Sequence, residues 1–281
     1  MAVKRLPSFD LVVATVDRVA ALERLFDSLD AQTERAFRVL LVDQNPDDRL
    51  APALERPWSF EVVRLRSERG LSRARNAALD RIQGDLVAFP DDDCTYEPEL
   101  LGAVARRFAD EPELDGLVGR AVNEDGYSSA SWSATPAILT RDNLWNRVIS
   151  YTIFLRSRIV ERVGRFDETL GLGSNGRRGS GEEIEYLVRA LTGGARIAYD
   201  PQLLVTHPER TYSPDERLEL AARDGASVGY ILRKHGYPGK TLGRMLVRPV
   251  GGATLALARG KAGQARVHLA TLRGRLHGYR S

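Results

Sequence analysis

Three consecutive carboxylates, Asp91, Asp92 and Asp93, follow the apolar segment at residues 85–89. Neighbouring carboxylates repel one another, so this arrangement at the end of a buried strand favours a bound cation. Hard oxygen ligands suit Mg²⁺ or Mn²⁺, which bind through one or two carboxylates together with substrate phosphates. The triplet therefore predicts a divalent metal site. The structural alternative is an acidic turn in which Asp93 caps the next helix.

Two arginines, Arg69 and Arg75, belong to the run Arg-Gly-Leu-Ser-Arg-Ala-Arg-Asn at residues 69–76, where a helix is expected to begin. Arginine side chains and the amides at a helix N-terminus both favour phosphate oxygens. Arginines at the start of an exposed helix are also commonly only solvated. Beside a metal site at the same sheet edge, however, the run indicates a phosphate site.

Alternating strands and helices position these groups. The first half of the chain has β-branched apolar runs at residues 9–15, 38–43, 60–65 and 85–89, and helical spacing of apolar residues at 21–29 and 71–82. Such alternation predicts an α/β fold with a mostly parallel sheet. In these sheets ligands bind outside the carboxyl ends of the strands, which is where Thr15, Asp43 and the acidic triplet fall.

The second half is less regular. We expect a helix at residues 99–108, a strand at 116–122, a helix at 182–191, strands at 195–199 and 203–206, and helices from residue 214 onward. Five glycines and two adjacent arginines mark the segment at residues 171–181. Its composition fits a loop that closes over a ligand and fits equally a surface connector.

Composition excludes several classes of protein. The 281 residues are 43% hydrophobic and 28% charged, unlike disordered, collagenous or coiled-coil chains. A single cysteine, Cys94, cannot form an internal disulfide, which favours a reducing compartment such as the cytoplasm. We find no signal-peptide pattern and no apolar stretch of about 18 residues, so we expect no membrane-spanning segment.

The net charge of +3 is unevenly distributed along the chain. Residues 1–224 carry 30 basic and 38 acidic side chains, a charge of −8, whereas residues 225–281 carry 11 Lys or Arg and no acid. An acidic body is a poor nucleic-acid binder, so no nucleic-acid partner is expected. The basic segment favours an anionic membrane surface, or is simply a solvated basic tail.

The order of these segments resembles family 2 glycosyltransferases of the GT-A fold over about residues 8–210. The resemblance rests on the runs at residues 13–18, 41–43, 70–76, 91–93, 164–168 and 181–183, in this order. It implies a Rossmann-related α/β/α sandwich at residues 1–215, with a nucleotide-sugar-binding half at about 1–120 and an acceptor-binding half at 121–215. A basic helical extension would follow at residues 216–281.

The resemblance also implies which residues hold the nucleotide. Asp43 would contact the base, Asp91 the ribose and Asp93 the metal, with Asp92 as a second candidate for the ribose. The full set of implied nucleotide-binding residues is Thr15, Asp17, Arg18, Asp43, Arg69, Arg75, Asp91 and Asp92. Here Gln44-Asn45-Pro46 replaces the family's usual sequence after the base-binding aspartate, so UDP and dTDP both stay open as the donor nucleotide.

A divalent ion has a clear chemical role in such an enzyme. Breaking the bond between the sugar and the diphosphate develops negative charge on a phosphate oxygen, which Mn²⁺ or Mg²⁺ neutralises. The implied metal ligands are Asp91, Asp93 and His207, the last at the end of a predicted strand and followed by Pro208. A histidine that hydrogen-bonds loop carbonyls is the alternative for His207.

The acceptor side is represented by two glutamates and a tryptophan. Glu183 aligns with the second acidic residue of the family's Glu-Asp pair and, as the base, would take the proton of the attacking hydroxyl. Ser180 and Glu183 also have the spacing of a capping box, which needs no chemistry. Glu182 and Trp132 are the candidates for acceptor binding, although tryptophan more often packs in a core.

Together these features predict an inverting, metal-dependent transfer of a sugar, of hexosyltransferase type, from a nucleotide diphosphate sugar to a hydroxyl acceptor. The expected acceptor is a saccharide or lipid-linked glycan of cell-envelope polysaccharide type, reached from the cytoplasmic side and at the inner face of the membrane. The alternatives are a sugar nucleotidyltransferase, which lacks support because residues 15–18 contain no glycine-rich loop or lysine, and a noncatalytic carbohydrate-binding module.

Overall fold

The computed structural model of the protein describes residues 5–128, 132–174 and 178–281. They form two compact units, the first comprising Met1–Phe166 and Tyr186–Glu209 and the second Asp167–Glu185 and Arg210–Ser281. This division places the segment Asp167–Glu185 with the C-terminal helices. The predicted domain boundary at residue 215 stays a prediction.

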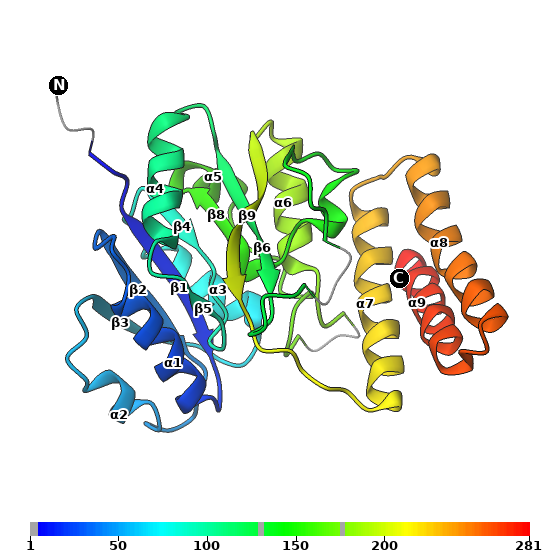
Figure 1. The fold of residues 1–281 in the computed structure, drawn as a ribbon, viewed down its shortest axis with the longest axis horizontal. Coiled ribbons are helices and arrows are strands. Elements are labelled where there is room, and N and C mark those ends of the chain that lie inside the picture. Colours follow the sequence, from blue (N-terminus) through cyan, green and yellow to red (C-terminus); the bar gives the residue numbers. More distant parts are fainter. Residues whose placement is uncertain (1–4, 129–131, 175–177) are drawn as a thin grey trace. The chain divides into compact units, whose positions relative to one another are not determined.

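The first unit is built on one sheet (Figure 1). Its strand order is β3-β2-β1-β4-β8-β6-β9-β5, with β7 paired to β9. The pairs among β1 to β4 are parallel, as is β6 with β9, whereas β5, β7 and β8 run antiparallel to their neighbours. The strands are β1 Phe9–Thr15, β2 Phe37–Asp43, β3 Glu61–Arg66, β4 Leu86–Ala88, β5 Thr95–Tyr96, β6 Gly116–Val122, β7 Ala137–Ile138, β8 Ile153–Arg156 and β9 Ile197–Thr206.

Helices cover both faces of this sheet (Figure 1). Alternate residues of a strand point to opposite faces, so Phe9, Leu11 and Val13 of β1 meet the apolar stripe of α1 in one buried cluster, which α4 also joins. Helix α3 contacts β1 and β2 from the other face. The helices of this unit are α1 Val19–Asp30, α2 Ala51–Leu54, α3 Leu71–Leu79, α4 Leu100–Asp110, α5 Ser157–Val163 and, from Tyr186 onward, α6 Glu182–Thr192, with single 3₁₀ turns at Leu144–Asn146 and Ser150–Thr152.

One expectation about the strands was wrong. We predicted two strands around Asp200 and Pro201, but β9 is continuous through both residues. Its partner β6 absorbs the irregularity with a register shift between Val118 and Arg120. Gly119 sits at this point, where a Cβ atom would collide with the carbonyl oxygen of Leu203. A bulge with a glycine at the close approach therefore replaces the expected break.

The second unit is mainly three helices, α7 Pro214–Lys234, α8 Gly239–Ala258 and α9 Ala262–Arg280, with α9 packed against both others (Figure 1). Helix α7 begins at a capping box in which Ser213 and Glu216 bond to each other's backbone amides. Helices α7 and α9 touch through glycines. A Cβ at Gly278 or at Gly229 would collide with backbone atoms of the facing helix. The expected α/β class with a basic helical C-terminal segment is confirmed.

Candidate active site

The acidic triplet lies directly after β4, beside the carboxyl end of β1, as the parallel strands require. Asp92 accepts a hydrogen bond from the Thr15 hydroxyl at 2.7 Å and another from the Arg18 guanidinium at 2.9 Å. The same Arg18 nitrogen lies 2.5 Å from a carboxylate oxygen of Asp93. One cation from the β1–α1 turn therefore holds two of the three carboxylates at the sheet edge.

A metal-binding geometry arises where His207 joins the triplet. Ligand atoms of Asp91, Asp93 and His207 all lie within 4.8 Å of one another. His207 follows β9, its backbone amide donates to Val122 of β6, and its Nε2 atom lies 2.9 Å from a carboxylate oxygen of Asp93. The imidazole stacks on Tyr151 with ring centroids 4.7 Å apart. Two carboxylates and one imidazole are a donor set that fits Mn²⁺ or Mg²⁺.

The ionisation of these groups follows from their burial and pairing. Burial raises the pKa of Asp92 to about 6, against the hydrogen bond from Thr15 and the charge of Arg18. Burial also disfavours the charged forms of Asp93 and His207, which lie 2.9 Å apart. Their mutual hydrogen bond and attraction outweigh that penalty, lowering the pKa of Asp93 and raising that of His207. A metal ion would have to replace the proton shared by this pair.

Arg75 of α3 is buried next to Asp91 of the acidic triplet. Its side chain is 1% exposed, and its guanidinium lies 3.3 Å from a carboxylate oxygen of Asp91. The same group sits over the rings of Phe89 and Phe166, at 5.8 and 5.6 Å from their centroids. Arg75 is therefore a buried cation that contacts Asp91. The nucleotide contact expected of Arg75 stays a prediction.

Two further predicted residues meet in the turn after β1. Asp17 adopts a left-handed backbone conformation with φ of 61°, and its amide donates to the side chain of Asn45 at 2.7 Å. Its carboxylate pairs with Arg69 at 2.8 Å and also with Arg49. The loop before α3 and the turn after β1 are thus joined, and the phosphate contacts expected of Arg69 stay a prediction.

Asp43 ends β2 with its side chain fully buried. Its carboxylate accepts hydrogen bonds from Asn45 at 2.9 and 2.8 Å and from Arg64 at 2.6 and 2.9 Å. Burial disfavours the ionised form, but these bonds outweigh it and lower the pKa of Asp43. A cavity of about 560 Å³ adjoins this position, with Gln44, Asn45 and Arg66 in its wall. Asp43 thus lies next to a cavity, and its carboxylate is already hydrogen-bonded to Asn45 and Arg64. Its contact with the nucleotide base stays a prediction.

Sequence reasoning missed several residues of this region. Arg64 and Arg66 of β3 both reach Asp43, at 2.6 and 3.1 Å. Their spacing of two residues on a strand puts them on one face and was the available signal. Ser150, whose hydroxyl lies 3.3 Å from Asp91, gave no such signal because it comes from a distant part of the chain.

The predicted acceptor residues fall in different places. Trp132 belongs to the first unit and is partly buried against its main apolar cluster. Glu182 and Glu183 open helix α6 in the second unit, and Glu182 is 4% exposed. Helix α6 starts at Glu182, which puts Gly181, with φ of 85°, at the N-cap position. Ser180 instead donates to Asp224 at 2.8 Å, so its hydroxyl makes a contact other than the predicted cap.

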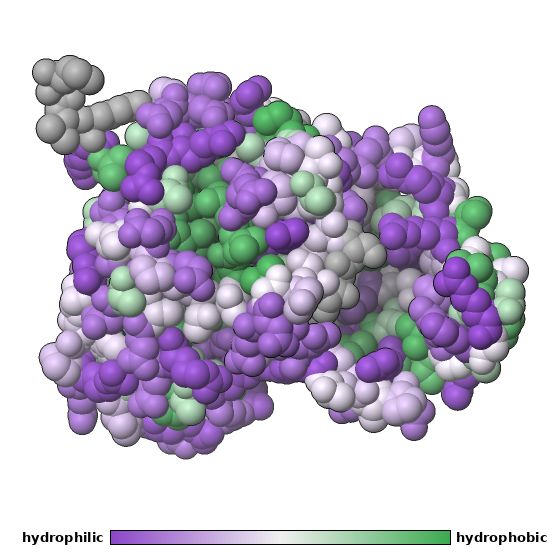
Figure 2. Space-filling model, in the orientation of Figure 1, coloured by the Kyte–Doolittle hydropathy of each residue, from purple (hydrophilic) through white to green (hydrophobic). Residues whose placement is uncertain are grey.

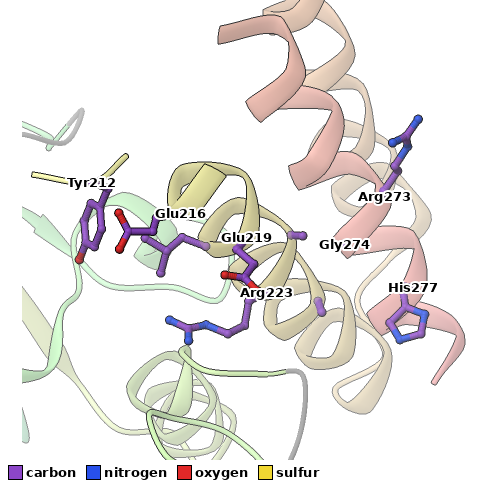
Figure 3. A pocket seen from close by; sticks show the side chains of 10 residues that line it. Tyr212, Glu216, Glu219, Arg223, Arg273, Gly274 and His277 are labelled. Carbon is purple, nitrogen blue, oxygen red and sulfur yellow. The ribbon is translucent and has the colours of Figure 1, made fainter. Parts of the chain in front are cut away.

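The second unit also has a pocket of its own between α7 and α9, of about 620 Å³ (Figure 3). Figure 3 shows Glu216, Glu219 and Arg223 on α7 and His277 on α9 in its wall. The described part of this wall contains none of the residues predicted to bind the acceptor.

The fold is that of the GT-A glycosyltransferases. The structure of the mannosyltransferase PcManGT from Pyrobaculum calidifontis in complex with GDP-Man and Mn²⁺ superposes with a TM-score of 0.64 at 16% identity, covering 98% of this chain and 87% of the other. The structure of S. aureus TarS 1–349 in complex with UDP-GlcNAc superposes with a TM-score of 0.60 at 18% identity, covering 95% and 92%.

The chain belongs to glycosyl transferase family 2, whose family model matches residues 10–162, more than half of its length. It is 28% identical over 248 residues to a pre-mycofactocin glycosyltransferase of Mycobacterium tuberculosis, covering 82% of this chain and 48% of that protein. The chain thus spans about half the length of this relative. It is 27% identical to the succinoglycan biosynthesis protein ExoM of Rhizobium meliloti, covering 90% and 81%. The resemblance and the enzyme class predicted from the sequence are confirmed.

Proposed function

We propose that this glycosyltransferase moves a sugar from a nucleotide diphosphate sugar to a hydroxyl acceptor by single displacement, with inversion at the anomeric carbon. The observation that carries the proposal is the convergence of Asp91, Asp93 and His207 at the carboxyl edge of the sheet. In such a displacement the acceptor oxygen forms a bond to the anomeric carbon while the bond to the diphosphate breaks. The hydroxyl proton must leave at the same time.

The donor is proposed to bind along the carboxyl edge of β1, β2 and β4. Asp91, Asp93 and His207 would hold Mn²⁺ or Mg²⁺, and a bound ion would neutralise charge on the departing diphosphate. Arg18 and Arg69 offer guanidinium groups to phosphate oxygens, and their side chains are 32% and 64% exposed. The cavity beside Asp43 is proposed to take the base, with UDP or dTDP as the nucleotide.

Glu183 is proposed as the base that removes the proton of the acceptor hydroxyl. Two observations support this role over a purely structural one: α6 begins at Glu182, and Ser180 donates to Asp224. Glu182 and Trp132 are proposed to contact the acceptor. Succinoglycan biosynthesis, named for one relative, makes a cell-envelope saccharide or a lipid-linked glycan the acceptor class to test first.

Release of nucleoside diphosphate tests the reaction. The purified chain is incubated with UDP-, dTDP- and GDP-sugars, with Mn²⁺, with Mg²⁺ or with a chelator, and with saccharide acceptors. We expect release with one nucleotide only and with metal only, and a product of inverted anomeric configuration by NMR. Pyrophosphate exchange without diphosphate release would instead indicate a nucleotidyltransferase.

The role of Glu183 has a matched test. Glu183→Gln should lower kcat by about 10²–10⁴-fold, the usual contribution of general acid–base catalysis, with the donor KM nearly unchanged. Glu161→Gln, an exposed glutamate on α5, is the control and should behave as the wild type. Full activity of Glu183→Gln would assign the proton transfer to another group.

We also propose that the C-terminal helices bind an anionic membrane surface, where a lipid-linked acceptor would lie. Exposed apolar side chains on α8 and α9 lie among hydrophilic ones (Figure 2). They are Val247, Val250, Leu255, Leu257, Leu269, Leu276 and Tyr279. Eleven Lys or Arg and no acid follow Asp224. Exposed apolar side chains together with cations are typical of interfacial helices. Among the described residues no helix has both the length and the apolar character to cross a bilayer.

Vesicle sedimentation tests the membrane proposal. We expect binding to vesicles containing phosphatidylglycerol, weaker binding at high salt and little binding to phosphatidylcholine alone. Leu257→Asp should weaken the binding, because Leu257 is 59% exposed on α8. Ile138→Asp, at a 45% exposed position on β7, is the control. Equal binding to both kinds of vesicle would contradict an anionic surface.

A further inference from the structure

A network of charged and polar side chains in the second unit joins the segment Asp167–Glu185 to the end of α7. Lys234, the last residue of α7, lies at its centre. Its ammonium nitrogen is 2.7 Å from a carboxylate oxygen of Asp167 and 2.9 Å from one of Glu185. These two acids stand at the two ends of the segment. One cation of α7 therefore bridges the two ends of the segment.

Each acid has further partners on the same helix or just beyond it. Asp167 accepts a hydrogen bond from the Tyr230 hydroxyl at 2.8 Å. Glu185 has no exposed surface, and its oxygen lies 3.0 Å from the Nε2 atom of His235. A fully buried carboxylate is costly without cationic or hydrogen-bonding partners, so this arrangement depends on Lys234 and His235.

The ammonium stays charged in this position. Burial disfavours the charged form of Lys234, but the hydrogen bonds and charges of Asp167 and Glu185 outweigh burial and raise its pKa. Burial also disfavours the charged form of Asp167, but its hydrogen bonds from Lys234, Thr169 and Tyr230 outweigh burial and lower its pKa. Both ends of the segment are thus held by the charged ammonium of Lys234 at neutral pH.

Residues 178–181 of the segment are docked on α7 as well. Ser180 donates to Asp224 at 2.8 Å, and the Arg178 guanidinium lies over the Tyr230 ring, 4.1 Å from its centroid. Gly181 approaches so closely that a Cβ there would lie 3.1 Å from Ile231 and 3.4 Å from Ser227. The left-handed φ of Gly181 and this close approach set where α6 begins.

We propose that Lys234 is a positioning residue that fixes the first turn of α6, and with it Glu183, by bridging Asp167 and Glu185. The inference rests on the proposed role of Glu183 as the base. Glu183 and Glu185 belong to the same helical turn, so anchoring Glu185 limits the rotation and translation of Glu183. Without the ammonium, Asp167 and Glu185 would face each other as like charges and move apart. A shift of about 1 Å in a catalytic group costs about 10²-fold in rate.

Steady-state kinetics of Lys234→Met test this proposal. We expect kcat for transfer to fall by about 10- to 100-fold, with donor KM and Mn²⁺-dependent UDP binding within about twofold of the wild type. Lys234→Arg keeps a cation and should recover part of the rate. Arg217→Met, at an exposed arginine near the start of α7, is the control. Wild-type kcat in a folded Lys234→Met protein, or an equal loss of UDP binding, would overturn the proposal.

The double variant separates positioning from general structural support. If Lys234 acts through Glu183, Lys234→Met should have no further effect on kcat in the Glu183→Gln background. The same fold loss in both backgrounds would mean that Lys234 supports the fold only. Failure of the proposed function has a different signature, because Glu183→Gln alone would then keep full activity.

A milder variant serves if Lys234→Met does not fold. Tyr230→Phe keeps the ring that packs against Arg178 and removes only the hydroxyl that Asp167 accepts from. We expect kcat to fall about three- to tenfold with donor KM unchanged. An unchanged kcat in this variant would count against the network as a positioning device.

Discussion

Asp167 offers the sharpest quantitative test of how the second unit is held together. Its carboxylate accepts hydrogen bonds from Lys234 at 2.7 Å, from Tyr230 at 2.8 Å and from the amide and hydroxyl of Thr169 at 3.0 and 2.7 Å. The side chain is 13% exposed. Asp167→Asn replaces one carboxylate oxygen by an NH₂ group, so that two of these donors face another donor in place of an acceptor. The change also removes the negative charge that faces Lys234.

The expected cost follows from these contacts. Hydrogen bonds that involve a charged group contribute about 1.5–3 kcal/mol each, and breaking a fully buried pair costs about 3–5 kcal/mol. Lys234 keeps 33% of its side-chain surface accessible, so solvent screening reduces its share. We therefore expect Asp167→Asn to lower the free energy of unfolding at pH 7 by about 1–3 kcal/mol.

The pH dependence fixes the sign of this contribution. The folded-state pKa of Asp167 lies below its ordinary value, with burial opposing the shift and the hydrogen bonds from Lys234, Thr169 and Tyr230 producing it. A group with a lowered folded pKa contributes stability above its unfolded pKa of about 3.9 and loses it as the pH falls further. At pH 3 the wild type should have lost about 1 kcal/mol of this contribution. The difference in free energy of unfolding between the wild type and Asp167→Asn should therefore be smaller at pH 3 than at pH 7 by the same amount.

Urea unfolding followed by far-UV circular dichroism measures both effects. The three tryptophans, Trp58, Trp132 and Trp145, all lie in the first unit, so fluorescence would miss the helices that Asp167 anchors. Asp215→Asn, at an exposed position in the first turn of α7, is the control. The reasoning would be refuted if wild type and Asp167→Asn had the same free energy of unfolding at pH 7, or if the difference between them grew on acidification.

Three further predictions follow from other parts of the chain. Arg75→Met should lower the free energy of unfolding by about 2–4 kcal/mol, as measured by urea titration, because it removes a buried cation and its two cation–π contacts. It should also weaken Mn²⁺ binding, as measured by calorimetry, because that cation contacts Asp91. Gly278→Ala should lower the melting temperature because its Cβ would meet the backbone of Ala226, whereas Gly243→Ala, with open space around it, should not. Removing residues 239–281 should abolish binding to vesicles that contain phosphatidylglycerol, as measured by sedimentation.

The sheet edge could be predicted from the sequence because it depends on local patterns. Buried parallel strands appear in a sequence as short runs of β-branched residues. The residues that follow each run lie together at one edge of the sheet. This logic placed Thr15 beside Asp92 although 77 residues separate them. The family resemblance, rather than this logic, pointed to His207 as a metal ligand, and the structure places its ring 2.9 Å from Asp93 because β9 ends at the same edge as β4.

Contacts that depend on how distant elements pack had no local signal. Ser150 reaches Asp91 from a 3₁₀ turn, and Lys234 reaches Asp167 and Glu185 from the last residue of a long helix. Charge along an exposed helix is usually solvated, so the sequence alone gives no reason to single out Lys234. The continuous strand β9 was missed because proline normally ends a strand, and the glycine of the neighbouring strand that accommodates it is visible only in three dimensions.

Isothermal titration calorimetry of UDP and dTDP, with and without Mn²⁺, tests most directly whether Asp91, Asp93 and His207 form a metal and diphosphate site. We expect one of the two nucleotides to bind with a stoichiometry of one in the presence of Mn²⁺, and Asp93→Asn to weaken that binding at least tenfold. Asp110→Asn, an exposed aspartate at the end of α4, should bind as the wild type does. Nucleotide binding that is unaffected by Mn²⁺ and by Asp93→Asn would contradict the account.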